Sequence, residues 1–347
     1  MKNNFFVKIF LGGGIFLALG ALIVWYLGIF FRATPPAPVL TRESFDWQEQ
    51  EHVWSLYIDA VGLDKGYDEL VRAYQDQTYF VNQHNIAHVI GILLYKRLGI
   101  AGVAKCRSNF GLGCYHSFFT EAVRASGPDI VPTLNEACNK LGADGFAVGC
   151  EHGIGHAVVV YAGFERSDLL RALALCDRGQ PSLPVSGCVA GAYMEYNFRQ
   201  IMSIESEGRA GGIRPFDPQY PNDPCDTLPD RFQESCYYSQ PEWWGEVLDH
   251  DYRRVGELCG RVPDRWQARC FAGTGRAVGQ YLQPKADRVG ELCWEMPMDA
   301  GRISCALSAG RLYADDPATA SELPILCTDL AARGAVEVVQ KLCGVSL

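Results

Sequence analysis

The hexapeptide RVGELC occupies residues 254–259 and returns unchanged at residues 288–293, 34 residues further along the chain. An identical stretch at such a distance indicates a chain built from repeats, because a fixed period of about 20–50 residues is typical of stacked structural units. The cysteine that ends each copy is followed by another cysteine 11 or 12 residues later. The positions of the cysteines can therefore be used to align the repeats with one another.

All fourteen cysteines fall into seven pairs, five of which have this spacing of 11 or 12 residues. The pairs are Cys106/Cys114, Cys138/Cys150, Cys176/Cys188, Cys225/Cys236, Cys259/Cys270, Cys293/Cys305 and Cys327/Cys343. Their first members advance by 32, 38, 49, 34, 34 and 34 residues. An even count with this regularity predicts seven disulfides, each within its own repeat. The alternative, zinc bound by thiolates of neighbouring repeats, lacks the short CxxC spacing of zinc ligands.

Each repeat is predicted to be a pair of helices. The first helix carries the first cysteine near its end, as in RSDLLRALALC at 166–176, and the second opens with the second cysteine, as in CEHGIGHAVVVYAG from residue 150. Residues 64–98 read as a hairpin without cysteines, in which Asn82 takes the cysteine's place. Small residues that follow the second cysteine, such as Gly153 and Gly155, are expected to let neighbouring helices approach closely. The prediction is an all-α fold, an α-solenoid of about seven to eight hairpins.

In period and cysteine pairing, residues 46–347 resemble the helical-hairpin repeat proteins of the tetratricopeptide and Sel1-like class, especially secreted forms whose hairpins carry a disulfide. The resemblance implies a stack of hairpins with extended faces, on which many unrelated functions are built. The Cys-x-x-Gly-x-Gly opening of the second helices departs from those families. The resemblance therefore bears on the fold class and transfers no activity.

The N-terminus carries 23 uncharged residues from Ile9 to Phe31. About 20 apolar helical residues cross the hydrocarbon core of a bilayer, so residues 1–33 are predicted to be an uncleaved signal-anchor helix whose partner is the lipid bilayer through residues 9–31. Lys2 and Lys8 favour a cytoplasmic N-terminus. Residues 34–45 are a proline-rich linker, and residues 46–347 form an extracytoplasmic repeat domain, periplasmic or at the cell surface. The many cysteines favour the same compartment independently, because disulfides persist outside the reducing cytosol.

The charge balance limits the partners of this domain. The chain has a formal net charge of −9, and its first 33 residues carry three positive charges and no acid, which leaves −12 on the remainder. An acidic surface repels the phosphate backbone, so no nucleic-acid partner is expected. Another protein of the cell envelope remains a candidate partner.

Five of the seven histidines occupy two equivalent positions, two and six residues after the second cysteine or its substitute. They are His84, His88, His116, His152 and His156. Residues four apart share one face of a helix, and equivalent positions on stacked repeats lie side by side, so the five imidazoles are expected to form one patch. Neutral imidazole is the commonest protein ligand of transition metals. With Glu121 and Glu151 as neighbouring carboxylates, the pattern predicts a site for iron, zinc or copper.

Two functions of different kinds agree with this pattern. The first is a membrane-anchored metalloprotein with a multi-histidine site, with redox catalysis as its expected activity; whether it is an enzyme stays open. The segments HNIAH and HGIGH lack the glutamate of the HExxH peptidase motif, which disfavours peptidase action. The second is a disulfide-stapled interaction scaffold in which the histidines form a structural, hydrogen-bonded seam.

Two further stretches interrupt the repeats. An insertion at about residues 199–224 is long enough to fold over the histidine face and exclude water. The stretch CYYSQPEWW at 236–244 carries four large aromatic side chains, which at helical spacing are expected to lie in the core.

Overall fold

The computed structural model describes residues 37–38, 46–75, 80–141, 146–179, 187–199, 212–281, 286–315 and 320–344. Across these residues all regular secondary structure is helical, with fifteen α-helices and no strand, which confirms the all-α class. The predicted anchor over residues 1–33 and nearly all of the linker lie outside the described residues. The chain divides into two compact units, Met1–Asp76 and Gln77–Leu347.

The first unit contains α2 (Trp47–Val61) and α3 (Leu63–Tyr74), which pack against each other. Helix α2 begins at a good N-cap, because the side chain of Asp46 accepts a hydrogen bond from the backbone N–H of Glu49. Trp54 is fully buried beside Tyr74, with their ring centroids 6.4 Å apart. The predicted hairpin over residues 64–98 is therefore divided: its first helix pairs with α2 here, and its second helix belongs to the second unit.

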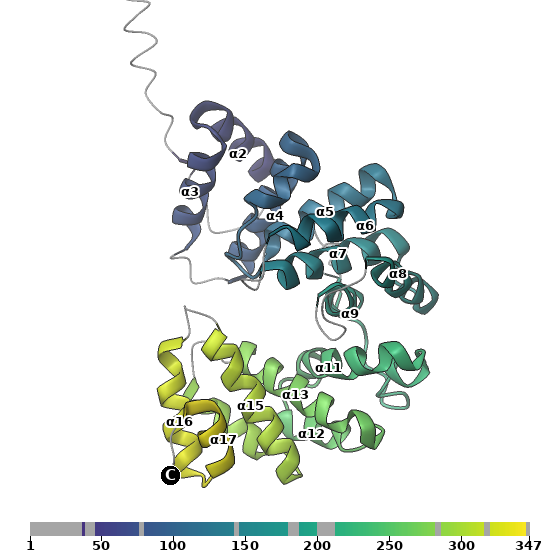
Figure 1. Ribbon diagram of the computed structural model, residues 1–347, viewed down its shortest axis with the longest axis vertical. Coiled ribbons are helices and arrows are strands. Elements are labelled where there is room, and N and C mark those ends of the chain that lie inside the picture. Colours follow the sequence, from purple (N-terminus) through teal and green to yellow (C-terminus); the bar gives the residue numbers. More distant parts are fainter. Residues whose placement is uncertain are drawn as a thin grey trace, which may run out of the picture. The chain divides into compact units, whose positions relative to one another are not determined.

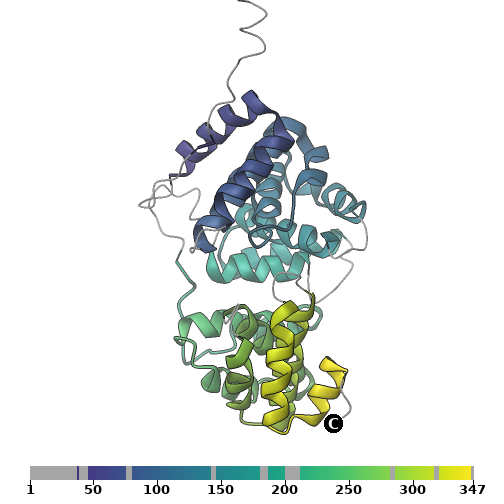
Figure 2. The same ribbon diagram turned by 90° about the vertical axis from the view of Figure 1, so that its left-hand side faces the viewer.

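The second unit contains the seven cysteine repeats and is built around the helices that follow each turn, which we call the second helices. They are α4 (Phe80–Leu98), α5 (Gly113–Ser126), α7 (Phe146–Ala162), α9 (Cys188–Phe198), α11 (Asp230–Val247), α13 (Asp264–Tyr281) and α15 (Asp299–Asp315). Each second helix packs against the next one in sequence (Figures 1 and 2).

The first helices of the repeats are α6 (Val131–Asn139), α8 (Arg166–Arg178), α12 (Tyr252–Cys259) and α14 (Val289–Trp294). Each packs against the second helix that follows it in sequence. The chain closes with α16 (Leu323–Ala332) and α17 (Val336–Cys343), which pack against each other.

Seven disulfides join the fourteen cysteines in the pairs that their spacing predicts. The bonds are Cys106–Cys114, Cys138–Cys150, Cys176–Cys188, Cys225–Cys236, Cys259–Cys270, Cys293–Cys305 and Cys327–Cys343. A cross-link that closes a loop of about a dozen residues stabilises the fold by roughly 3 kcal/mol in the chain-entropy model. The fully oxidised set is consistent with an oxidising, extracytoplasmic compartment.

The placement of the first cysteines near the ends of first helices is confirmed in four repeats. These cysteines are Cys138, Cys176, Cys259 and Cys293. Each of these disulfides fastens the end of one helix to the next helix of the same repeat.

The prediction that each second helix opens with its cysteine was wrong in most repeats. It holds for Cys188, the first residue of α9. Four other second cysteines lie inside their helices, at least one turn after the helix begins: Cys150 in α7, Cys236 in α11, Cys270 in α13 and Cys305 in α15. In the last repeat, Cys343 ends α17 instead of opening it. The second cysteine therefore shows where the disulfide joins the helix to the rest of its repeat, and it does not show where the helix begins.

Local residues explain the early start of three of these helices. Helices α11, α13 and α15 begin at Asp230, Asp264 and Asp299, six residues before Cys236, Cys270 and Cys305 respectively. An acidic residue in the first turn interacts favourably with the helix dipole. A proline directly precedes the first two of these aspartates, and its fixed φ suits the entry to a helix. Helix α7 likewise begins at Phe146, four residues before Cys150.

Glycines of the second helices lie directly against the backbone of neighbouring helices, as the sequence predicts. A Cβ atom added to Gly155 of α7 would be 1.9 Å from the carbonyl oxygen of Cys188 in α9, and one added to Gly153 would be 2.7 Å from the backbone of Tyr115 in α5. The same contact recurs later, where a Cβ on Gly273 of α13 would be 2.0 Å from the carbonyl oxygen of Tyr238 in α11. These glycines set how closely neighbouring repeats stack.

One segment of the described residues, Gln83–Lys105, is long and apolar enough to cross a bilayer. It comprises most of α4 and the 3-10 helix η1 (Gly99–Lys105). In the most apolar 18-residue stretch of this segment, 56% is buried inside the protein. Ile90 and Leu94, for example, are fully buried. Its apolar character therefore matches that of a core helix packed against α5.

The aromatic stretch on α11 lies in the core, as expected. Trp243 and Trp244 are buried, and their indole N–H groups donate to the backbone carbonyls of Arg214 and Pro221 at 2.8 and 2.9 Å. The Arg214 guanidinium lies 3.7 Å from the centroid of the Trp243 ring and donates to Asn197 of α9 at 2.9 Å. The described end of the insertion is thus fastened to α9 and α11, whereas residues 200–211 lie outside the described residues.

The close helix contact at Gly155 is testable by the variant Gly155→Ala. Because the added methyl group overlaps the Cys188 carbonyl oxygen, we expect the free energy of unfolding to fall by about 1–3 kcal/mol or more. The matched control is Gly212→Ala, since a Cβ at Gly212 would meet no atom within 4 Å. Urea denaturation with disulfides intact measures both, and equal midpoints for the two variants would contradict this account of helix packing.

Candidate metal centre

The structure gathers the five predicted histidines from three neighbouring second helices, α4, α5 and α7. They form two groups in which one nitrogen of each ring lies within 4.8 Å of the others: His84, His88 and His116, and His116, His152 and His156. His116 belongs to both groups. The expectation of one imidazole patch is therefore confirmed, and the patch has two halves joined by a shared ring.

The first half is the pair His84 and His88, one turn apart on α4. Their Nε2 atoms are 2.9 Å apart, and Nδ1 of His84 hydrogen-bonds to the backbone carbonyl of Phe110 at 2.9 Å. A carbonyl can only accept, so Nδ1 of His84 carries the hydrogen, and Nε2 carries the lone pair in the neutral ring.

The turn that supplies this carbonyl has an unusual backbone. Phe110 and Leu112 have φ values of 58° and 65°, on either side of Gly111 at 66°. The left-handed region costs a residue with a side chain about 1–2 kcal/mol. Such conformations persist where the surrounding structure over-determines them, and they cluster at functional sites. Here the turn orients one of the candidate ligands.

The second half is the pair His152 and His156, one turn apart on α7. Their Nε2 atoms are 3.1 Å apart, and Nδ1 of His156 hydrogen-bonds to Oε2 of Glu195 at 2.7 Å. Glu195 comes from the next second helix, α9, and both side chains are fully buried. The carboxylate fixes the tautomer of His156 and leaves its Nε2 lone pair directed at His152.

The spacing within each pair matches that of two ligands on one ion. Zinc–nitrogen bonds are about 2.0–2.1 Å long, so two nitrogens on one ion lie about 2.9 Å apart at a right angle and about 3.3 Å apart at the tetrahedral angle. The observed separations of 2.9 and 3.1 Å lie in this range. The distance within each pair is therefore that expected of two ligands on one ion.

His116 lies between the two pairs. Its ring stacks on that of His156 with centroids 3.9 Å apart, and it lies 5.2 Å from His84 and 5.4 Å from His88. The residue is only 2% exposed, yet neither ring nitrogen has a hydrogen-bond partner among the described residues. An unsatisfied buried polar group costs about 1–3 kcal/mol. Neither nitrogen is thus committed to a hydrogen bond, at a position that otherwise destabilises the fold.

Burial holds the cluster in its neutral form. It lowers the pKa of His84 and brings the pKa of His88, His116 and His156 well below 6.5; neighbouring histidines lower the last three further. Burial, followed by the positive charge of Arg276 and then His84, lowers the pKa of His152 to about 3. Neutral imidazole is the metal-binding form, so proton competition begins at lower pH than the ordinary histidine value indicates.

The two predicted carboxylate ligands are placed differently. Neither Glu121 nor Glu151 belongs to the two histidine groups. Glu121 forms an ion pair with Arg124 on its own helix, and Glu151 is fully buried close to Gly187, where an added Cβ would meet its Oε2 at 2.6 Å. The sequence places Glu195 seven residues after Cys188, the same position that Glu121 holds after Cys114, but Glu195 was not among the predicted ligands.

Later repeats carry other residue types at the positions that hold histidine in α4, α5 and α7. Glu242 and Arg276 each follow their second cysteine by six residues and form an ion pair of 2.7 Å between α11 and α13. The imidazole cluster is thus confined to the helices α4, α5 and α7, within the part of the chain that the structure describes.

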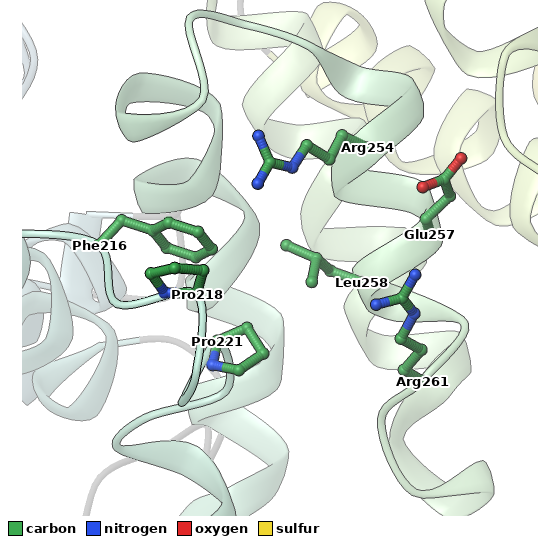
Figure 3. Close-up of a pocket in the computed structure, with 7 residues that line it drawn as sticks. All are labelled: Phe216, Pro218, Pro221, Arg254, Glu257, Leu258 and Arg261. Atoms are coloured by element: carbon green, nitrogen blue, oxygen red, sulfur yellow. The ribbon is translucent and has the colours of Figure 1, made fainter.

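A small cavity of about 100 Å³ lies elsewhere, beside the fastened end of the insertion. Figure 3 shows Phe216, Pro218 and Pro221 on one side of it, facing Arg254 and Leu258 of α12. Its lining contains no histidine and no free thiol. The histidine cluster therefore remains the stronger candidate for metal chemistry.

Comparison with known proteins places the chain in no family: no family model, curated protein or solved structure matches it.

The lowered pKa values predict how stability depends on pH in the metal-free protein. In the unfolded chain these histidines protonate as the pH falls through about 6.5, whereas in the fold they stay neutral to lower pH, so the free energy of unfolding decreases below 6.5. Each such histidine contributes a slope of about 1.4 kcal/mol per pH unit. Urea denaturation at pH 7, 6 and 5 should show a shallower slope for His116→Leu than for the wild type. Equal slopes would contradict a buried, neutral His116.

Proposed function

We propose that this protein is a membrane-anchored, extracytoplasmic α-solenoid that binds transition-metal ions through His84, His88, His116, His152 and His156. The observation that carries the proposal is His116, a buried imidazole with no hydrogen-bond partner among the described residues, placed between two histidine pairs. The anchor is proposed from the uncharged run at residues 9–31, and the compartment from the seven disulfides.

The hydrogen-bond partners of the outer histidines support metal binding. A metal-ligating histidine almost always donates its second ring N–H to a carboxylate, a backbone carbonyl or water, which fixes its tautomer and orientation. His156 donates to the Glu195 carboxylate and His84 to the Phe110 carbonyl. Both therefore present Nε2 as the ligand atom, the same atom with which each faces its neighbour on the helix.

The donor set limits which ions are expected. Imidazole suits zinc, copper, iron and nickel, whereas magnesium and calcium prefer oxygen ligands. Three imidazoles per group leave at least one further coordination position open, which a catalytic ion requires. Copper or iron at this site would permit electron transfer and a redox activity, whereas zinc would permit Lewis-acid chemistry.

The alternative is a disulfide-stapled interaction scaffold with a structural histidine seam. It is favoured by the Nε2 contacts of 2.9 and 3.1 Å, which are also good hydrogen bonds between neutral rings of opposite tautomer. In that case the stacked hairpins would bind another envelope protein, and the cluster would serve only to hold α4, α5 and α7 together.

Elemental analysis of protein purified without an affinity tag separates the two functions. We expect at least one transition-metal ion per chain in the wild type, and a clear loss in the double variant His152→Ala/His156→Ala. The control is His52→Ala, on an exposed position of α2 outside the cluster, which should retain the full content. Wild-type protein without stoichiometric metal after loading, or a double variant whose metal content equals that of the wild type, would favour the scaffold.

The role of Glu195 is tested against a matched carboxylate. Glu195→Gln removes the negative charge behind His156 while keeping an acceptor, so we expect metal affinity to fall about 10–100-fold. Glu121→Gln changes the equivalent position of α5, where the carboxylate pairs with Arg124, and should leave the affinity unchanged. Competition titration with a chromophoric chelator measures both affinities. Equal affinities for the two variants would show that Glu195 does not support a metal ligand.

A further inference from the structure

We infer that the cluster is a dinuclear centre in which His116, as an imidazolate, bridges one ion held by His84 and His88 and a second ion held by His152 and His156. The inference rests on the proposed function and adds to it the number of ions, the identity of the bridge and an inequality between the two positions. Three features of the described residues support it.

The first feature is the arrangement of the ligands. The five histidines form two groups of three, and the one residue common to both is His116. Each remaining pair has its own close Nε2 contact, so two separate pairs of ligand atoms exist. A single ion would use one pair with His116 and would leave the other pair without an ion.

The second feature is the state of the His116 ring. Both of its nitrogens are buried, and neither is hydrogen-bonded within the described part of the chain. A single ion would satisfy only one nitrogen and leave the other buried without a partner. The two nitrogens of an imidazole point away from the ring in different directions, so two ions satisfy both and lie on different sides of the ring.

Proton balance is simple for this arrangement. Neutral His116 carries one N–H and one lone pair. The first ion takes the lone pair, and the second takes the other nitrogen as its hydrogen leaves to solvent as a proton. No oxidant or reductant takes part. The imidazolate charge lies between two cations, which reduces their mutual repulsion.

The third feature makes the two positions unequal. The His152/His156 position is backed by the carboxylate of Glu195, whereas the His84/His88 position is backed by the uncharged carbonyl of Phe110. A negative charge behind a ligand raises the basicity of that ligand and favours a cation. The ion beside His156 should therefore bind first and more tightly.

Copper(II) titration of the tag-free, metal-free full chain, followed by electron paramagnetic resonance, tests the inference. We expect two coppers per chain. The integrated signal should rise with the first equivalent and then fall with the second, because an imidazolate bridge couples the two spins antiferromagnetically. Saturation at one copper, or a signal that doubles with the second equivalent, would overturn the bridge while leaving metal binding intact. No tight copper binding at all would instead refute the proposed function.

Two matched variants complete the test. His84→Gln/His88→Gln should bind one copper with a full signal and nearly wild-type affinity for the first equivalent, whereas His152→Gln/His156→Gln should bind one copper at least tenfold more weakly. In His116→Asn, any two coppers that bind should give the full signal of independent ions. Spin coupling that persists in His116→Asn, or equal copper affinities in the two double variants, would contradict the shared ring or the inequality. Each double variant keeps one intact half, so failure of His116→Asn to fold leaves the test complete.

Discussion

The close approach of neighbouring helix backbones at glycine is the constraint on which the rest of this structure depends. Gly91 and Gly113 bring α4 against α5, Gly153 brings α7 against α5, and Gly155 brings α7 against α9. A Cβ at any of these positions would lie within 3.0 Å of a neighbouring backbone atom. At this spacing the imidazoles of three successive second helices come together in one cluster. Each glycine weakens its helix by about 1 kcal/mol relative to alanine. The helices are therefore locally less stable at these positions, but their backbones can pack more closely.

The disulfides act on a different part of the architecture. Each joins cysteines 8 to 16 residues apart within one repeat, and so stabilises mainly by restricting the unfolded chain. They do not cross between neighbouring second helices, whose contacts depend on glycine, on apolar packing and on pairs such as His156 with Glu195. The histidine cluster therefore lies where the fold depends on packing between repeats, and ions bound there would add a cross-link that no disulfide supplies.

Much of this organisation was predictable from the sequence, because it depends on regular spacing. The cysteine pairs, the helical class and the shared position of the five histidines all follow from the period. The sequence did not predict which carboxylate reaches the histidines, because this depends on how neighbouring helices are shifted along each other. It also did not predict the first residue of several second helices, because this depends on the residues before the cysteine. Glu195 and Glu121 occupy the same position in their helices, yet the first reaches His156 and the second pairs with Arg124. The cysteines within α7, α11, α13 and α15 do not open these helices, and in the last three an aspartate in the first turn already favours the earlier start.

X-ray absorption spectroscopy of the protein, loaded with copper or zinc and freed of excess ion, tests the central claim most directly, because it reports the ligands rather than the amount of metal. The account predicts a first shell dominated by nitrogen at about 2.0–2.1 Å, with the multiple scattering of imidazole rings and an average of about three imidazoles per ion. A first shell of oxygen without imidazole scattering would place the ion on the acidic surface and would contradict a metal centre built from these histidines.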